Sequence, residues 1–505
     1  MDLQELIQDT LAKVAAAVKA TKEGPGMRKA IDIAQGLYGY SLQKPAQQLV
    51  PLMSPFYNSI PRVVKPGANS DNWKQITALS SPELFTSERA AGNLFTTTVT
   101  PKTAAFKVSA LRGEVTREAQ AASVTFDDAL AKETANTLLI SLKLMGQAYL
   151  YANVTDLGTP NTPVVTEVNA VGTIGAADYF VVVVGLTGMA ANRTTVDLPD
   201  VWDGTNAFLA GRAVLSADLN PLQVTTALSG VGLSIISAQG TVTTTGADNG
   251  LRIKWTAKPG FCAYAIFVGT VTGAANLHCE AIVSQTEVTL TSLAGTGVLA
   301  NENTVTIPTA DETGNAKHFD GILPNLLAVG SGAYIKAVNG TLTGALADGE
   351  VVQIQQAFAA LWRTAKIGKF RVVMSGQDVK NLTKKGIISN AMQIFAGMGA
   401  EGRVNLTIGA HVGEILNATT GDRCPVEVEP WAVPGTVFIL PMEIPYPMAN
   451  ISTPFQWVGN YDWERWEYAS TPTTGPIYPF ETRCNGVLEP LFTGGCGVLY
   501  NIYNG

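Results

Sequence analysis

The fold is decided by two consecutive stretches, AAFKVSALRGEVTREAQAAS at 104–123 and FDDALAKETANTLLISLKLMGQAYLYAN at 126–153. The second stretch has apolar and small residues at helical spacing, and Thr125 with Asp128 forms an N-cap followed by an acidic first turn. The residues on this stripe are Leu130, Thr134, Leu138, Leu142, Met145 and Tyr149. We therefore predict a helix over 126–153 that is about 40 Å long, which is unusual in a globular domain.

The residues before this helix have no compact core pattern. Between 66 and 118 there is a strand-like segment at Trp73–Ile76, a polar stretch, a Thr-rich run and a second strand-like segment at Phe106–Val115. A long two-stranded hairpin fits this pattern, and an isolated hairpin is only marginally stable in water. The first 65 residues predict a helix and then an extended stretch punctuated by prolines. We therefore expect the first 120 or so residues to lack an interior of their own and to be stabilised chiefly by neighbouring copies.

The residues after the helix change composition twice. From about 154 to 316 Thr, Val, Gly and Ala dominate, and Leu251, Ile253 and Trp255 alternate with polar residues, which is typical of a half-buried strand. Further short strands are predicted at 180–184, 263–268 and 287–293, as in a β-sandwich. Residues 325–450 predict helices and strands around a mixed sheet. Their elements are a helix at 350–366, a strand at 370–374, a helix capped by Ser375 and Asp378, and strands at 426–429 and 436–440.

Composition excludes several classes of protein. Hydrophobic residues make up 46% and charged residues 15% of 505, which excludes disorder, and 34 basic against 41 acidic residues give no positive field for DNA or anionic lipid. The most apolar run, YFVVVVGL at 179–186, is far shorter than the ~20 residues that cross a bilayer. Five cysteines without CxxC spacing predict buried thiols rather than disulfides or a zinc site.

Catalysis has little support in the sequence. The chain has three histidines, His278, His318 and His411, and neither a GxSxG elbow nor a P-loop. Acidic residues beside Trp463 and Trp466 imitate a glycosidase pair, but a contact between subunits explains the same cluster. These acidic residues are Asp462, Glu464 and Glu467. We predict no catalytic residue, no cofactor and no metal site.

The order of these parts resembles the major capsid proteins of tailed double-stranded-DNA phages, which have the Hong Kong 97-type coat fold. The resemblance rests on AAFKVSALRGEVTREAQAAS, on the long helix ending in LMGQAYLYAN, on HFDGIL at 318–323 and on LEPLFTGGCGVLYNIYNG at 488–505. It implies an α+β fold with an N-terminal arm, an E-loop hairpin, a peripheral domain with a long spine helix, and an axial domain. An inserted all-β sandwich separates the spine helix from HFDGIL.

The insertion is similar to a fibronectin type III or other immunoglobulin-like domain. The similarity is carried by LRIKWTAKPGFCAYAIFVG at 251–269 and QTEVTLTSL at 285–293, which resemble the Trp and Tyr strands of that family. DYFVVVVGLTG at 178–188 resembles the late Tyr-containing strand but comes before the Trp strand. Either the strands are permuted or two small β modules lie here.

The resemblance implies seven segments. They are the arm 1–65, the E-loop 66–112, the peripheral domain 113–158, the insertion 159–312, a return to the peripheral domain 313–324, the axial domain 325–440 and a C-terminal segment 441–505. By the same analogy, the hairpin and the capsomer-centre loop at 386–403 contact neighbouring subunits, although packing within one subunit explains them equally well. The candidate contact residues are Trp73, Lys74, Phe95, Lys102, Phe106, Met392, Phe395 and Met398.

The implied function is a head shell of hexamers and pentamers that encloses double-stranded DNA without sequence-specific binding, with the insertion decorating its outer surface. The implied partners are other copies of the chain and portal, scaffold and decoration proteins, with no membrane. The implied location is the virion, after synthesis in the host bacterial cytoplasm. In some such capsids an E-loop Lys is joined to a neighbour's Asn, a role open to Lys74 or Lys102. The alternatives are a carbohydrate-binding phage tail or surface adhesin and, more distantly, a glycoside hydrolase using Asp462 and Glu464.

Overall fold

The structure is a computed structural model of the 505-residue chain. It describes residues 55–79, 82–123, 128–192, 207–208, 232–246, 248–270, 277–293, 311–345, 350–388, 396–398, 404–406, 412–446, 451–468 and 476–503. The chain divides into two compact units, of which the first comprises Met1–Val50 and Glu118–Ala129. The sheets that the described residues form lie in the second unit, Pro51–Arg117 and Leu130–Gly505. The predicted mixture of helices and sheets is confirmed.

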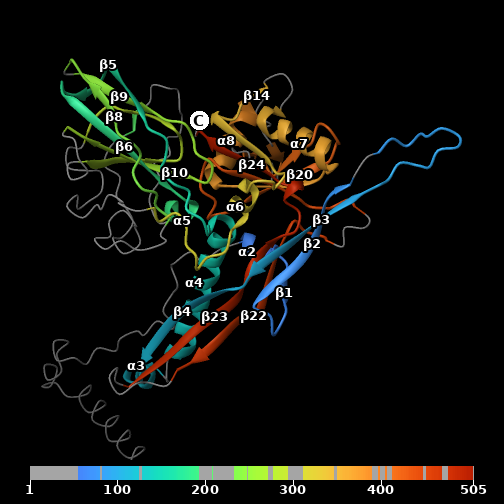
Figure 1. Ribbon diagram of the computed structural model, residues 1–505. Coiled ribbons are helices and arrows are strands. Elements are labelled where there is room, and N and C mark those ends of the chain that lie inside the picture. The colour runs from blue at the N-terminus through green and yellow to red at the C-terminus, as the bar shows by residue number, and fades with distance from the viewer. Residues whose placement is uncertain are drawn as a thin grey trace, which may run out of the picture. The chain divides into compact units, whose positions relative to one another are not determined.

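One sheet carries the long helix. Its four strands run in the order β1 (Arg62–Val64), β22 (Phe455–Glu467), β23 (Ile477–Pro490) and β4 (Lys107–Thr116). The predicted helix is confirmed as α4 (Ala129–Tyr151), 23 residues or about 35 Å long. It lies against the sheet (Figure 1), with Ser141 Oγ 3.3 Å from Thr482 Oγ1. The predicted N-cap at Thr125 lies outside the described residues.

The end of the predicted arm belongs to this body, which is a correction. The stretch expected to be extended contains a short helix, α2 (Pro55–Ser59), because proline is tolerated in the first turn, where its missing N–H has no partner to lose. Phe56, Tyr57 and Ile60 are buried in the main core, and β1 pairs in parallel with β22. Residues 55–65, like β4, therefore have an interior within their own chain.

A second sheet has six strands. Their order is β13 (Tyr334–Gly340), β24 (Gly497–Ile502), β21 (Val437–Pro441), β16 (Phe370–Met374), β20 (Arg423–Val428) and β19 (Glu414–Leu416). Phe358 of α7 (Val352–Ala365) stacks on Phe370 of β16 at 5.2 Å between ring centroids. The predicted cap of α8 (Gly376–Ile388) is confirmed, since Ser375 Oγ accepts from the backbone N–H of Asp378 at 3.1 Å and donates to Asp378 Oδ2 at 2.7 Å. Other short elements are α3 (Arg117–Ser123), α5 (Gly188–Ala191), α6 (Ile322–Leu327), β14 (Gly344–Ala345), β15 (Glu350–Val351), β17 (Ala396–Met398), β18 (Val404–Leu406) and η4 (Thr493–Gly495).

The inserted segment forms one two-sheet sandwich. One sheet has the order β11 (His278–Val283), β10 (Ala263–Gly269), β6 (Asp178–Leu186) and β8 (Gly240–Thr243). The other has the order β5 (Val164–Ile174), β9 (Asn249–Lys254), β12 (Glu287–Leu290) and β7 (Ala207–Phe208). Both sheets contribute to a single hydrophobic core, with Trp255 against Tyr264 at 5.2 Å. Of the two alternatives left by the sequence, a single module fits and two separate modules do not.

The sheet that contains β6 is buried on both of its faces. Val181 and Val183 point into the core of the sandwich, whereas Val182 and Val184 join the main core that also contains Tyr151 and Phe438. This explains why YFVVVVGL is apolar throughout instead of alternating. Hydrogen bonds reinforce the junction, since Asn501 Nδ2 of β24 donates to Thr286 Oγ1 at 2.9 Å. The sandwich is therefore part of the body and not a tethered appendage.

A hairpin is present, and it is formed by β2 (Ser70–Leu79) and β3 (Thr97–Ala105). The two strands are antiparallel, and Trp73 is paired with Lys102 (Figure 1). Pairing within the hairpin ends at Ala105, because the chain then enters β4, where Lys107–Thr116 pair with β23. The strand-like segment Phe106–Val115, which the sequence pattern placed in the hairpin, instead belongs to β4 of the first sheet, which is a correction.

Candidate functional site

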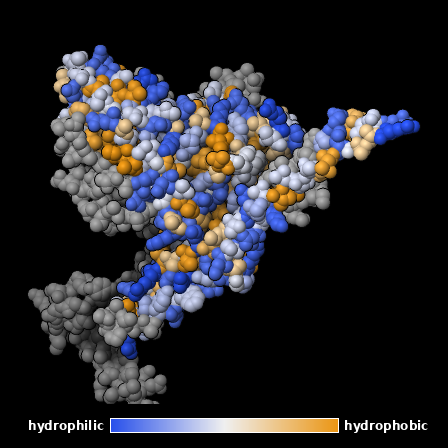
Figure 2. Space-filling view, viewed as in Figure 1, coloured by the Kyte–Doolittle hydropathy of each residue, from blue (hydrophilic) through white to orange (hydrophobic). Residues whose placement is uncertain are grey.

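The described part of the hairpin is exposed along much of its length. Every residue of β3 is exposed or half-buried, and the connection at 82–96 is exposed throughout. Figure 2 shows apolar surface on the hairpin short of its hydrophilic tip. The strongly exposed apolar side chains, with exposed fractions, are Ile76 (65%), Leu84 (84%), Phe85 (82%), Leu94 (83%), Phe95 (55%) and Val99 (48%). We call this set the hairpin apolar surface.

The sequence identified one member of this surface, Phe95, and missed the others. The residues around Leu84 and Phe85 are polar, so these two side chains are not part of a helical or strand periodicity that would have indicated a role. Their signal is an apolar pair between Pro82 and Ser87, in a segment that has no strand or helix around it. Large apolar side chains in contiguous exposed patches are typical of surfaces that contact another protein.

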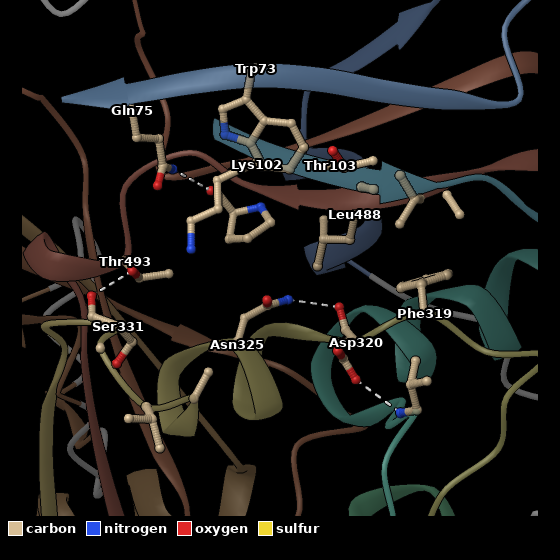
Figure 3. Close-up of a pocket in the computed structure, with 18 of the residues that line it drawn as sticks. Trp73, Gln75, Lys102, Thr103, Phe319, Asp320, Asn325, Ser331, Leu488 and Thr493 are labelled. Atoms are coloured by element: carbon tan, nitrogen blue, oxygen red, sulfur yellow. Dashed lines mark hydrogen bonds between the residues drawn. The ribbon is translucent and has the colours of Figure 1, made fainter. Parts of the chain in front are cut away.

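The root of the hairpin, where β2 and β3 meet the body, encloses a pocket of about 390 Å³. Two predicted contact residues line it: Trp73 is half-buried, and in Figure 3 the Lys102 ammonium extends into the pocket from β3. Lys74, the next residue along β2, is exposed. Across the pocket, Asn325 Nδ2 donates to the carbonyl of Asp320 at 2.8 Å.

The root is held by Gln75. Its side-chain amide donates to the carbonyl oxygens of Pro490 at 3.0 Å and of Leu491 at 2.9 Å, at the end of β23 (Figure 3). These two bonds tie the hairpin to the body while leaving its outer half uncovered by the described residues. The geometry is that of an anchored arm with an exposed apolar surface.

The remaining predicted contacts are placed differently. Phe106 is half-buried and packs against the main core of its own chain. Met398 ends β17, which pairs with β18. Met392 and Phe395 lie outside the described residues. The structure thus brings Trp73 and Lys102 together at the pocket, whereas most of the 386–403 loop lies outside the described residues.

The acidic and aromatic cluster on β22 takes part in a contact within the chain, between Asp462 and Arg62. Both carboxylate oxygens of Asp462 accept from Arg62, at 3.0 Å from Nε and 2.5 Å from Nη2. The Arg62 guanidinium also lies 3.9 Å from the ring centre of Trp457, and Trp463 Nε1 donates to Tyr57 Oη at 2.8 Å. Asp462 therefore fastens α2 and β1 to the sheet. Burial raises the pKa of Tyr57 to about 12, against the lowering effect of Arg62, so this phenol stays neutral.

The cysteines are all buried, as predicted, and none is in a disulfide. Burial raises the pKa of the Cys262 thiol to about 12. His318 lies 3.3 Å from Asn315 Nδ2, and His411 lies outside the described residues. Within the described ranges, no three His, Cys, Asp or Glu side chains gather as a metal site. Among the described helices, none is both long and apolar enough to span a membrane.

Comparison with known proteins gives only distant structural likenesses. No protein-family model and no curated protein match the chain. The capsid of a native GTA particle is 10% identical, with 94% of this chain and 99% of that chain covered and a TM-score of 0.40. The capsid of Myoviridae phage XM1 is also 10% identical, with coverages of 94% and 100% and a TM-score of 0.39. The holo-SrpI encapsulin complex from Synechococcus elongatus PCC 7942 is 7% identical, with coverages of 91% and 93% and a TM-score of 0.37.

Proposed function

We propose that this chain is the major capsid protein of a tailed double-stranded-DNA phage, which assembles into an icosahedral head shell. The single observation that carries the proposal is the hairpin apolar surface, held at its root by Gln75 and uncovered over the rest of its length by the described residues. A neighbouring copy of the same chain is the partner that would cover it. The chain is then a structural protein and not an enzyme.

The order of the elements supports the same proposal. An anchored hairpin, a strand that leads to a long helix, a sandwich, and a second sheet with two helices follow each other along the chain. These are the parts that the capsid resemblance implies: E-loop, spine helix, insertion and axial domain. Residues 55–65 complete the first sheet, so the proposed arm is confined to the residues before them.

The free energy of assembly would come from covering the hairpin apolar surface. Each Leu, Phe, Ile or Val that passes from full exposure to burial contributes roughly 1.5–3 kcal/mol. Association costs on the order of 4–15 kcal/mol in lost freedom, so several such side chains per contact are needed. The contact is heterologous, because the hairpin of one copy meets a different surface of the next, and it closes into rings when its rotation is satisfied.

The proposed cargo is the phage genome. A net charge of −7 leaves no strong attraction between the chain and phosphate, which suits DNA that slides during packaging and is bound without sequence specificity. Portal, scaffold and decoration proteins are the further proposed partners. The proposed location is the virion, after synthesis in the bacterial cytoplasm.

The test is electron microscopy of the expressed full chain beside two variants. We expect icosahedral particles or hexameric capsomers for the wild type, and unassembled, natively folded subunits for the double variant Leu84→Ser/Phe85→Ser. The matched control is Val164→Ser, which removes a side chain that is 65% exposed on the sandwich and should leave assembly unchanged. A wild-type chain that stays monomeric under all assembly conditions, or a double variant that assembles normally, would contradict the proposal.

The adhesin alternative needs a binding head that acts by itself. The sandwich does not have this character, because the β6 sheet shares the main core with Tyr151 and Phe438. The glycosidase alternative needs an open pair of carboxyl groups, and Asp462 is occupied by Arg62. Neither alternative is favoured by a specific observation.

A further inference from the structure

The root of the hairpin contains a second feature, a pair of acidic side chains from different parts of the chain. Asp71 lies near the start of β2, and Glu489 lies near the end of β23, next to the carbonyl of Pro490 that accepts from Gln75. Glu489 is 1% exposed. One carboxyl therefore belongs to the hairpin and the other to the body.

The surroundings of Glu489 supply too few donors for an ionised carboxylate. Gln456 Nε2 donates to Oε2 at 3.0 Å, but no N–H or hydroxyl donor of the described residues reaches Oε1. The remaining neighbour is the Asp71 carboxyl, which lies close enough to Glu489 for each group to shift the pKa of the other. Two carboxyl groups form a hydrogen bond only when one of them carries a proton. A proton shared by the pair satisfies the buried oxygen, and its loss leaves two facing negative charges.

We propose that Asp71 and Glu489 form a proton-dependent latch that holds the root of the hairpin to β23 when protonated and releases it when the proton leaves for solvent. The other ionised group that faces the pair is Lys65, which follows β1 and forms an ion pair with Asp71. β22 contributes the neutral Gln456. The single positive charge of Lys65 balances one carboxylate but not two. When Asp71 and Glu489 are both ionised, one negative charge therefore has no positive partner among the described residues.

The direction of the pH dependence follows from the two pKa values. Burial, together with the Asp71 carboxyl and against Gln456 and Lys65, raises the pKa of Glu489 to about 7 from 4.5. The closed latch thus holds a proton that the open one releases, so closing is favoured at low pH and loses this advantage as pH rises from about 4.5 to about 7. Burial acts to raise the pKa of Asp71, but hydrogen bonds from Lys65 and Glu489 prevail and lower it, so its contribution is lost only in stronger acid.

The test is hydrogen–deuterium exchange of the unassembled full chain between about pH 5 and pH 8.5, corrected for the intrinsic pH dependence of exchange. The opening constant for Ser70–Leu79 should rise up to about tenfold per pH unit between about pH 5 and pH 7, and then level off. Strands β6 and β10 are the internal reference, and their opening should not follow this curve. Because the measurement uses single subunits, its outcome is independent of shell assembly.

Two variants test the latch, one with a substitution at Glu489 on the body and one with a substitution at Asp71 on the hairpin. Glu489→Gln imitates the protonated carboxyl and should flatten the pH dependence of exchange in β2. Asp71→Asn removes the facing carboxyl and supplies an amide donor but leaves Glu489 buried, so it should reduce the slope. Glu467→Gln is the matched control, since Glu467 is 70% exposed on β22, and it should keep the wild-type slope. A flat wild-type profile, or an unchanged slope in either latch variant, would overturn the proposal. If Glu489→Gln does not fold, the Asp71→Asn profile decides alone.

Discussion

Strands β6 and β10 of the sandwich and strands β2 and β3 of the hairpin are both antiparallel pairs, but their side chains have opposite environments. All seven residues of β10 are buried, whereas no residue of β3 is. Both pairs have a backbone ladder, which is continuous between β6 and β10 and shifts register once between β2 and β3, at Ile76 and Ala78. What differs is the number of apolar layers that cover each pair, two for β6 and β10 and none among the described residues for most of the hairpin.

This difference teaches where the stability of the chain resides. Burial of apolar side chains is the main favourable term in folding, so the sandwich contributes to the stability of the single chain. The hairpin has apolar side chains of similar size, but the described residues leave them exposed. A substitution in the sandwich should therefore affect folding, and a substitution in the hairpin should affect association.

The largest expected effect is that of removing residues 160–310. The deletion uncovers the part of the main core that contains Tyr151 and Phe438, so we expect an insoluble or unfolded product, as judged by near-ultraviolet circular dichroism and size-exclusion chromatography. A deletion of the hairpin residues 72–103 is the matched control and should leave a folded, soluble subunit. A folded product from the first deletion would show that the sandwich is an independent appendage.

A smaller effect is expected for Phe267→Ala in β10. Phe267 is fully buried in the main core, and truncation of such a residue costs about 3–5 kcal/mol of the free energy of unfolding. Chemical denaturation followed by intrinsic fluorescence measures this loss. Val164→Ala, on the exposed side of the same sandwich, should cost less than about 0.5 kcal/mol. Similar losses for the two variants would contradict the assignment of β10 to a doubly covered layer.

The smallest effect on folding is expected for Phe85→Ser in the hairpin. Phe85 is 82% exposed, so the free energy of unfolding of the single chain should change by less than about 0.5 kcal/mol. Association of subunits, followed by light scattering, should nevertheless be strongly reduced. A loss of more than about 1 kcal/mol in the single chain would mean that the hairpin is already covered by its own subunit.

Much of the fold was predictable from local patterns. The helix α4, the strand at 370–374 and the cap formed by Ser375 and Asp378 depend on residues close together in the chain, and the structure has all three. The predicted stripe of α4 is only partly right, because Met145 and Tyr149 are buried and its other four residues are half-buried. The end of the arm was not predictable in this way. Phe56 and Tyr57 are buried by residues that lie up to about 400 positions away, such as Trp463, whose indole donates to Tyr57.

The candidate site was predictable only in outline. A hairpin was predicted, because a two-stranded pattern without a core indicates an arm, and the structure pairs Trp73 with Lys102 in it. The contact of Trp73, Lys102 and Phe95 with a neighbouring copy stays a prediction. The exposure of Leu84 and Phe85 and the pairing of Asp71 with Glu489 were not predicted, because burial and proximity are properties of the folded chain. Phe106 is half-buried against the core of its own chain, and its proposed contact with a neighbouring subunit stays a prediction.

The sequence by itself determined the elements, since helix and strand periods, caps and turns depend on neighbours within a few residues. It also determined that the hairpin has no apolar face pattern for a core of its own. Only the tertiary structure decided which apolar segments are covered, that YFVVVVGL lies between two cores, and that Arg62 closes over Asp462. The physical reason is that burial and electrostatic pairing depend on distances between residues in space. Chains with the same local pattern can fold with different distances between these residues.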